Sequence, residues 1–280
     1  MDLTKAFKVL EAKAEESIPV EAEDYIGADG LWICGKCGTP KQKRITIMDQ
    51  EMTPMCLCKC GKERFEAEQQ SIRDEKRQRK IEFLREKGFH DEAMRRWRFE
   101  NDDQSNAKLS TLGRRYVERF PEFLADGKGL LLFGEVGTGK SFISACIANA
   151  LIDQGYPCIC TNLSLISGLV KADGREDALD ELDRYALVVL DDLMAERDTE
   201  YMNELVHEVI DRRYRSGKPL IVTTNMTAEE IKSTVNIRRQ RIFSRLMEIC
   251  IPYEVKGVDR RREVLKQDFG KYAEILGLKE

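Results

Sequence analysis

The sequence predicts an α/β protein, with a parallel sheet flanked by helices, preceded by a small cysteine-rich module and a helical linker. From residue 91 onward, short apolar runs of buried-strand length alternate with segments of helical spacing. One of these runs leads into a glycine-rich octapeptide, GEVGTGKS, at residues 134–141. Five of the nine cysteines crowd into residues 34–60. A chain of 280 residues has room for one average domain and a smaller module.

The crowded cysteines indicate a metal site. Cys34 and Cys37 form one close pair, and Cys56, Cys58 and Cys60 follow after a hairpin-sized insert. Without a secretion signal, such crowding favours metal over disulfides. Two close pairs suit tetrahedral Zn²⁺, and we expect Cys34, Cys37, Cys58 and Cys60 to bind it, although spacing alone does not separate Cys56–Cys58 from Cys58–Cys60. An iron–sulfur cluster is the alternative, since without a metal so small a segment could hardly fold.

A charged helix should follow the cysteines. The segment from Lys62 to Lys87 contains neither glycine nor proline and is dense in residues that favour helices. Its few large apolar residues form no continuous stripe, so we interpret it as a solvated linker that ends at Gly88. The alternative is a surface for a partner or for DNA phosphates, through the basic residues 76–80.

The octapeptide fits the phosphate-binding pattern G-x-x-x-x-G-K-[ST] at every fixed position. It lies between the apolar run 129–133 and the helically spaced segment 142–152, which is the strand, loop and helix setting that the motif requires. Backbone N–H groups and the helix N-terminus should bind phosphates, Lys140 adds a charge and Ser141 a hydroxyl for Mg²⁺. The sequence therefore predicts a P-loop NTPase that binds ATP and Mg²⁺. The predicted phosphate-binding residues are Gly134, Glu135, Val136, Gly137, Thr138, Gly139, Lys140 and Ser141.

Polar side chains end two further predicted strands. The apolar run 185–190 leads into Asp191 and Asp192, and the run 220–225 ends in Asn225. Parallel strands bind ligands at their carboxyl ends, so these side chains should face the phosphate loop. We expect Asp191 to hold Mg²⁺ and Asp192 to orient the attacking water.

The overall composition argues against a membrane protein, and it limits any basic surface for nucleic acid to a local one. Acidic and basic residues nearly cancel, at a formal net charge of −4, so the chain carries no general basic footprint for nucleic acid. No stretch of 18 uncharged apolar residues and no apolar secretion signal occur in the sequence. We therefore expect a soluble, cytoplasmic protein with no membrane partner. The cysteines outside the cluster lie in apolar runs and are interpreted as core residues.

The P-loop, the paired acids and Asn225 together resemble the AAA+ ATPases, in which this asparagine is the sensor 1 residue. The sequence is more similar still to helicase loaders of the DnaC/DnaI type, over about residues 91–265. The pieces that carry the resemblance, besides the P-loop, are Val188–Glu196, Asp211–Arg213 before Val222–Asn225, Arg241–Leu246 and Gly257–Arg261.

This resemblance implies roles for arginines that no local pattern would single out. Arg245 would be the arginine finger that reaches the γ-phosphate bound by a neighbouring subunit, with Arg241 as a second candidate. Arg261 would be sensor 2 within its own subunit. Two departures from the family pattern are Met194, where glycine is frequent, and Asp192, where many AAA+ proteins have glutamate. The shorter acid predicts slow hydrolysis, with bound ATP acting mainly as a switch.

The resemblance implies an ATP-dependent loader of a hexameric replicative helicase. Residues 1–62 would form a zinc-binding module that docks on the helicase, residues 63–90 the linker, and residues 91–280 an AAA+ ATPase domain that binds single-stranded DNA and self-associates. Two alternatives are an IstB-type transposition helper ATPase and an adaptor that binds ATP without hydrolysing it.

Overall fold

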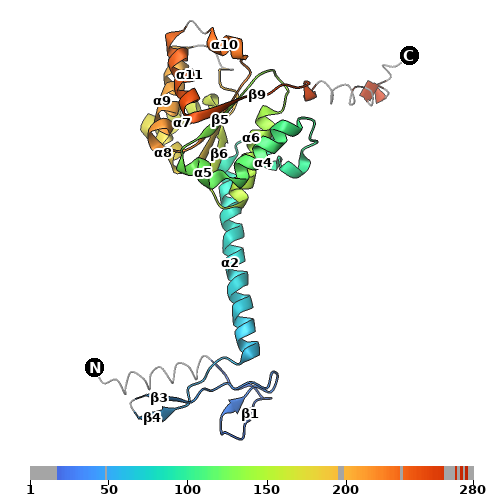
Figure 1. Cartoon of the computed structure of the whole chain (residues 1–280), viewed down its shortest axis with the longest axis vertical. Helices are drawn as coiled ribbons and strands as arrows, with labels where there is room; N and C mark the ends of the chain where they lie inside the picture. Colours follow the sequence, from blue (N-terminus) through green and yellow to red (C-terminus); the bar gives the residue numbers. More distant parts are fainter. Residues whose placement is uncertain are drawn as a thin grey trace. The chain divides into compact units, whose positions relative to one another are not determined.

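The computed structural model describes residues 18–47, 49–194, 199–233 and 236–261, and five residues of the C-terminal segment, 269, 272, 273, 275 and 276. These residues form two compact units (Figure 1), with the boundary between Gln78 and Arg79, inside one helix. None of the described helices is long and apolar enough to cross a membrane.

The N-terminal unit is built from two small antiparallel hairpins and the start of a long helix. Strand β1 (Tyr25–Ile26) pairs with β2 (Trp32–Ile33), and β3 (Ile45–Ile47) pairs with β4 (Gln50–Met52). Helix α2 (Lys59–Gly88) begins directly after Cys58 and contains Cys60 in its first turn. Its observed span confirms the helix predicted from composition, and the helix begins three residues earlier than expected.

The second unit contains a five-stranded sheet in the order β6-β7-β8-β5-β9, in which every pair is parallel. This confirms the predicted fold class. The last strand, at one edge of the sheet, was not expected from the sequence. The strands are β5 (Gly129–Phe133), β6 (Cys158–Thr161), β7 (Leu187–Leu190), β8 (Leu220–Thr224) and β9 (Cys250–Glu254).

Helices cover both faces of this sheet (Figure 1). Because side chains alternate along a strand, Leu130 and Leu132 of β5 pack on the face covered by α4 and α6, while Leu131 packs on the face covered by α9 and α11. The helices are α3 (Glu92–Arg96), α4 (Ala107–Glu118), α5 (Phe120–Ala125), α6 (Lys140–Asp153), α7 (Leu163–Asp173), α8 (Arg175–Arg184), α9 (Glu200–Ser216), α10 (Ala228–Lys232) and α11 (Ile237–Ile249), with a 3₁₀ turn at Phe99–Asn101.

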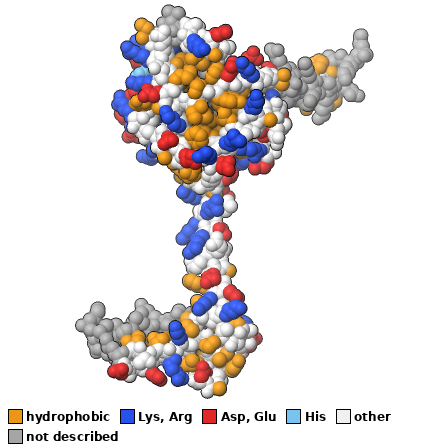
Figure 2. Space-filling model, in the orientation of Figure 1, with side chains coloured by type: hydrophobic (Ala, Val, Ile, Leu, Met, Phe, Trp, Pro, Cys, Tyr) orange, Lys and Arg blue, Asp and Glu red, His pale blue; other side chains and the backbone are white. Residues whose placement is uncertain are grey.

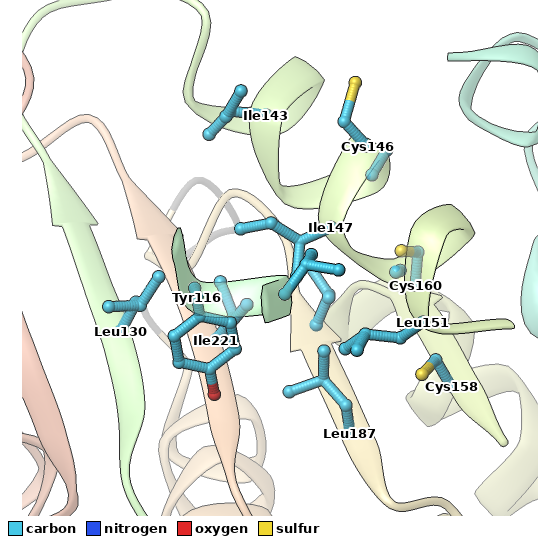
Figure 3. Close-up of a cluster of buried hydrophobic side chains, with 14 of the residues drawn as sticks. Tyr116, Leu130, Ile143, Cys146, Ile147, Leu151, Cys158, Cys160, Leu187 and Ile221 are labelled. Atoms are coloured by element: carbon cyan, nitrogen blue, oxygen red, sulfur yellow. The ribbon is translucent and has the colours of Figure 1, made fainter. Parts of the chain in front are cut away.

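The first core cluster fixes the helix that carries the phosphate loop. Ile147 and Leu151 of α6 point toward the sheet, near Leu187 of β7 and Ile221 of β8 (Figure 3). All these side chains are almost fully buried, so α6 has one orientation on the sheet. The cysteines outside the N-terminal cluster are likewise buried, as predicted: Cys146, Cys158, Cys160 and Cys250.

A buried arginine connects helix α9 to the segments that lead into the sheet. The Arg213 side chain on α9 is 1% exposed, and its guanidinium donates to the carbonyl oxygens of Tyr185 (3.1 Å), Pro219 (2.7 Å), Leu182 and Ala186. Burial lowers the pKa of Arg213 to about 10. These carbonyls belong to the last turn of α8 and to the segments that enter β7 and β8, so Arg213 serves the fold and not the site.

Candidate functional site

The phosphate loop connects β5 to α6 and requires glycine at three positions. Gly134, Gly137 and Gly139 have φ values of 124°, 78° and 96°, which side chains rarely allow. A Cβ atom at Gly134 would also lie 2.7 Å from the carbonyl oxygen of Val255, and one at Gly137 would lie 1.9 Å from Oδ1 of Asp259. The loop therefore lies directly against the segment that follows β9.

Lys140, the first residue of α6, lies inside this loop. Its side chain is almost fully buried, and Nζ donates hydrogen bonds to the carbonyl oxygens of Gly134 (2.8 Å) and Glu135 (2.6 Å). Burial lowers the pKa of Lys140, whereas the carboxylates of Asp192 and Asp191 act in the opposite direction. The predicted phosphate-binding lysine and the predicted acids thus share one electrostatic environment.

Asp191 follows the end of β7 and is positioned by a threonine that the sequence analysis did not single out. Thr223 Oγ1 on β8 donates to Asp191 Oδ1 at 2.6 Å and accepts from the backbone N–H of Asp192 at 2.9 Å. Burial raises the pKa of Asp191, while hydrogen bonds from Thr223 and Ser141 lower it. The contact with Ser141 brings together the two side chains predicted to hold Mg²⁺.

Asp192 and Asn225 meet beside the same loop. Asn225 Nδ2 donates to Asp192 Oδ1 at 3.2 Å, across the ends of β7 and β8. Asp192 has a φ of 53°, a left-handed conformation that is uncommon outside glycine. Backbone strain of this kind concentrates at functional sites, so the conformation of Asp192 is consistent with a role in chemistry.

The loop and these side chains enclose a cleft of about 240 Å³. Residues 136–142 form one wall, and Asp192, Asn225, Arg260 and Arg261 line the rest together with Trp97. Arg261, the predicted sensor 2 residue, therefore lies at the cleft. So does its neighbour Arg260, whose backbone N–H donates to the Gly137 carbonyl at 3.1 Å and whose guanidinium pairs with Asp103 at 3.1 Å.

Trp97 is a cleft residue that the sequence analysis did not place there. Its ring lies 5.7 Å from that of Phe142, the third residue of α6. The fully buried Asn149, also on α6, donates to the carbonyl oxygens of Met94 and Trp97, each at 2.9 Å. The helix that carries the phosphate loop thereby fixes the tryptophan at the mouth of the cleft.

Arg245 and Arg241 lie elsewhere, on α11. Arg245 forms an ion pair with Asp211 of α9, and its guanidinium carbon lies 5.9 Å from the ring centre of Tyr214. Neither arginine is among the described residues that line the cleft. The last two residues of the piece Val188–Glu196 lie outside the described residues.

In the N-terminal unit, four cysteines converge. The Sγ atoms of Cys34, Cys37, Cys58 and Cys60 all lie within 4.8 Å of one another, with Cys34–Cys60 at 3.6 Å and Cys58–Cys60 at 3.4 Å. Four thiolates bound tetrahedrally at about 2.3 Å from zinc would be separated by about 3.8 Å, so the cluster fits this ion. Cys56 lies outside the group, with its Sγ 4.0 Å from the Pro40 carbonyl oxygen.

The surroundings of the cluster favour the thiolate at Cys37, whereas burial raises the pKa of Cys58 and contacts with the neighbouring cysteines raise the pKa of Cys60 to about 12. Hydrogen bonds from the backbone N–H of Cys60 and from Thr39 lower the pKa of Cys37 to about 5. Cys58 and Cys60 lie at the N-terminus of α2, whose positive end stabilises negative charge. The backbone N–H of Gly61 also donates to the Cys58 sulfur at 3.4 Å.

A buried ion pair supports the first cysteine pair from the N-terminal side. Asp24 Oδ1 accepts from the backbone N–H of Gly35 at 3.1 Å, and Asp24 Oδ2 accepts from Lys41 Nζ at 2.6 Å. The hydrogen bond from Lys41 lowers the pKa of Asp24 to about 2. Both side chains are almost fully buried, so the turn at Cys34–Cys37 is held by residues outside the cysteine motif.

Comparisons with known proteins place this geometry in a family. The sequence profile described as IstB-like ATP binding protein matches residues 63–266. The replicative helicase loader DnaC of Escherichia coli (strain K12) is 27% identical over 156 residues, 54% of this chain and 60% of DnaC. The replicative helicase loader DnaI of Bacillus subtilis (strain 168) is 26% identical over 149 residues, 48% of each chain.

A crystal structure of the DnaC helicase loader superimposes with a TM-score of 0.52 at 22% sequence identity, over 59% of this chain and 100% of that chain. At this identity the likeness shows the fold, which is of the AAA+ type. The chain spans 60% or less of the length of the two curated relatives named above. Because the family profile covers most of the chain and includes the whole phosphate-binding cleft, the chain belongs to the family of IstB-like ATP binding proteins.

Proposed function

We propose that this protein is an ATP-dependent loader of a hexameric replicative helicase, located in the cytoplasm. Residues 1–62 form the zinc-binding module that contacts the helicase, residues 63–90 link it to the ATPase, and residues 91–280 bind ATP and single-stranded DNA and self-associate. The observation that carries the proposal is the cleft in which Lys140, Asp192 and Asn225 converge, with the carboxylate of Asp191 acting on the pKa of Lys140. Similarity to DnaC and DnaI supports the loader role in general terms.

Each side chain at the cleft has a role in nucleotide binding. Backbone N–H groups of the loop and Lys140 hold the phosphates, and Arg261 contacts them from the same subunit. Ser141 and Asp191 hold Mg²⁺, which neutralises charge on the phosphates. Asp192 and Asn225 orient a water molecule for attack, and their mutual hydrogen bond fixes both.

Slow turnover follows from the geometry around Asp192. The aspartate side chain is shorter by one methylene than that of glutamate. Its carboxylate accepts a hydrogen bond from Asn225, and its backbone N–H donates one to Thr223. The carboxylate therefore has little freedom to follow a water molecule. We expect bound ATP to act as a switch between helicase-bound and released states, with hydrolysis as the reset.

Arg245 completes the nucleotide site of a neighbouring subunit. Asp211 and Tyr214 hold its guanidinium at the surface of α9, away from the cleft of its own subunit. Adding an arginine in trans to a γ-phosphate can raise hydrolysis by roughly 10³–10⁵-fold. This role requires self-association, which ATP at the interface would stabilise.

Native mass spectrometry of the full chain mixed with a replicative helicase and Mg·ATP tests the proposal. We expect a complex with the helicase hexamer that responds to ATP. Lys140→Ala should lose ATP affinity and the ATP response, whereas Asp191→Asn should retain part of the affinity and lose Mg²⁺-dependent turnover. Failure to bind any replicative helicase, by a chain that contains zinc and binds ATP, would refute the loader role and leave the ATPase assignment standing.

A mixing experiment tests the trans arginine. Arg245→Ala should bind ATP nearly normally and fail to hydrolyse it. Mixing it with Lys140→Ala should restore part of the turnover, because Lys140→Ala supplies an intact Arg245 to the nucleotide on its partner. If the two variants co-assemble without activity above either one alone, Arg245 is a surface residue.

A second candidate is a transposition helper ATPase, favoured by the description of the matching family as IstB-like. Such a protein would bind a transposase and not a helicase, so parallel pull-downs distinguish the two. The converged cysteines favour the loader, since their module, residues 1–62, lies outside the residues 63–266 that match the IstB-like family. An ATP-binding adaptor without hydrolysis is distinguished by an ATPase assay with single-stranded DNA.

A further inference from the structure

A large apolar groove of the described second unit lies away from the nucleotide cleft. It encloses about 690 Å³ between α4, α5 and the edge strand β9. Its apolar residues come from segments far apart in the sequence: Leu112, Tyr116, Phe123, Leu130, Ile251 and Tyr253. The hydrophobic patch on this face of the unit is visible in Figure 2, over the region where Figure 1 shows α5 and β9. Large exposed patches of this kind mark interaction sites.

The edge strand exposes apolar side chains that a sheet edge normally avoids. Ile251 is 45% exposed, although it lies on the same face as the buried Leu130, its partner in the pairing with β5. Helices α4 and α5 cover β5 on this face and leave β9 with its outer side free. The groove therefore continues the hydrophobic core between α4 and the sheet to the surface, at β9.

The helix side of the groove is basic. Lys108, Arg115 and Arg119 line it, and their spacing places them along one stripe of α4, with Leu112 among them. Arg119 pairs with Glu122, whereas neither Lys108 nor Arg115 has a carboxylate partner among the described residues. An apolar floor flanked by unpaired positive charge favours an apolar partner that carries acids on one flank.

The edge strand does not favour addition of a further strand. The backbone N–H of Val255 donates to the Phe133 carbonyl at the end of β5. Because successive N–H groups of a strand point to opposite sides, the N–H positions of residues 250, 252 and 254 face away from β5, toward the free edge of the sheet. Pro252 has no N–H, and the N–H of Cys250 already donates to the Leu246 carbonyl. Only Glu254 remains as an outward donor, and proline at an edge is a recognised block to strand pairing.

We propose that this groove binds an amphipathic helix of another protein, with acidic residues along the flank that faces α4. Helix α4 contains 12 residues and is about 18 Å long, which matches about three turns of a bound helix. The apolar residues of the ligand would pack against Ile251, Tyr253 and Phe123, and its acids would pair with Lys108 and Arg115. This is a helix-in-groove mode of recognition, and it does not depend on the loader assignment.

A pair of synthetic peptides tests the proposed chemistry. One is a stapled helix of about 14 residues with leucines on one face and glutamates on one flank, and its twin carries lysine in place of each glutamate. In fluorescence anisotropy with the full chain, we expect the glutamate peptide to bind at least about tenfold more tightly than its twin. Equal binding of the two peptides, or no binding of either, would overturn the proposal.

Variants separate the apolar and the charged parts of the groove. Ile251→Glu should weaken binding of the glutamate peptide by about tenfold or more, with ATP binding unchanged as a control for folding. The double variant Lys108→Glu with Arg115→Glu changes only exposed positions, and it should prefer the lysine peptide. A preference that does not invert with this charge swap would count against the proposal.

A photo-crosslinker at Thr111, an exposed groove residue, identifies the natural occupant in cells. The expected crosslinked segment is an acidic amphipathic helix of another protein, displaced by the glutamate peptide. A crosslink to a second copy of this chain, to an extended segment or to a basic helix would contradict the proposal, as would the absence of any crosslink that the peptide displaces.

Discussion

Replacing Thr223 by valine tests how the magnesium-binding carboxylate is positioned. Valine has nearly the same shape as threonine, so the fully buried site on β8 remains filled. The substitution removes the hydrogen bond to Asp191 (2.6 Å) and the acceptor for the backbone N–H of Asp192 (2.9 Å). The Thr223 hydroxyl is fully buried, so water does not easily take its place beside these two groups.

The expected cost follows from these two contacts. A hydrogen bond to a charged group contributes about 1.5–3 kcal/mol, and a buried N–H left unpaired costs about 1–3 kcal/mol. For a domain of this size, a loss of 1 kcal/mol lowers Tm by about 2–4 °C, so we expect Thr223→Val to unfold about 10 °C below the parent.

Thr224→Val is the matched control, because Thr224 is equally buried on the same strand, donates to the neutral carbonyl of Leu193 at 2.8 Å and accepts from the backbone N–H of Met226 at 3.4 Å. Neither contact involves a charged group, so this variant should cost less, about 1–2 kcal/mol, and leave Mg²⁺ binding unchanged. Calorimetry gives the two Tm values, and titration of Mg²⁺ at fixed ATP gives the metal affinity. If both valine variants lose the same stability and bind Mg²⁺ equally well, Thr223 does not position Asp191.

The pH dependence supplies an independent measurement. Burial raises the pKa of Asp191, so this group stabilises the nucleotide-free fold at low pH, and that contribution is lost as the pH rises through the raised pKa. Magnesium needs the carboxylate, so Mg·ATP affinity should fall as the pH is lowered through the same value. The hydrogen bond from Thr223 lowers the pKa of Asp191, and Thr223→Val should therefore shift this loss of affinity to higher pH.

The remaining predictions concern the two units separately. Asp24→Asn should release zinc at a lower chelator concentration than the parent, as measured with a zinc-sensitive dye, while Glu23→Gln at the neighbouring exposed position should behave like the parent. A parent protein that contains no zinc by elemental analysis would remove the metal assignment. In a Trp32→Phe background, Mg·ATP should change the fluorescence of Trp97 at the cleft, and Lys140→Ala should abolish that change. An emission that does not respond to ATP would place Trp97 outside the nucleotide site.

Much of the nucleotide site could be predicted because its parts are encoded locally. The phosphate loop is one continuous motif, and Asp191 and Asn225 follow apolar runs whose carboxyl ends must meet in a parallel sheet. Thr223 was not singled out because the side chains of a strand alternate between the two faces of the sheet. This places Thr223 and Thr224 on opposite faces, but the sequence does not say which of the two contacts Asp191 and Asp192. Trp97 reaches the cleft only through contacts with α6, which no pattern near Trp97 encodes.

Two structural elements were missed for similar reasons. Strand β9 is five residues long, contains Pro252 and shows no alternation, so only its pairing with β5 identifies it. Asp24 lies ten residues before the first cysteine and contacts the cysteine turn through the fold of the module. The cysteines themselves were predictable as a cluster, and the choice of Cys60 over Cys56 needed the geometry that places Cys56 outside it.

The path of the chain after β9 connects two surfaces that are otherwise separate. Ile251 and Tyr253 line the apolar groove, and a few residues later Asp259 and Arg260 lie against the phosphate loop. One short segment thus takes part in both sites. If a bound helix and a bound nucleotide favour different positions of this segment, their affinities are thermodynamically linked. Such linkage is reciprocal, so ATP would change the affinity for the helix by the same factor as the helix changes the affinity for ATP.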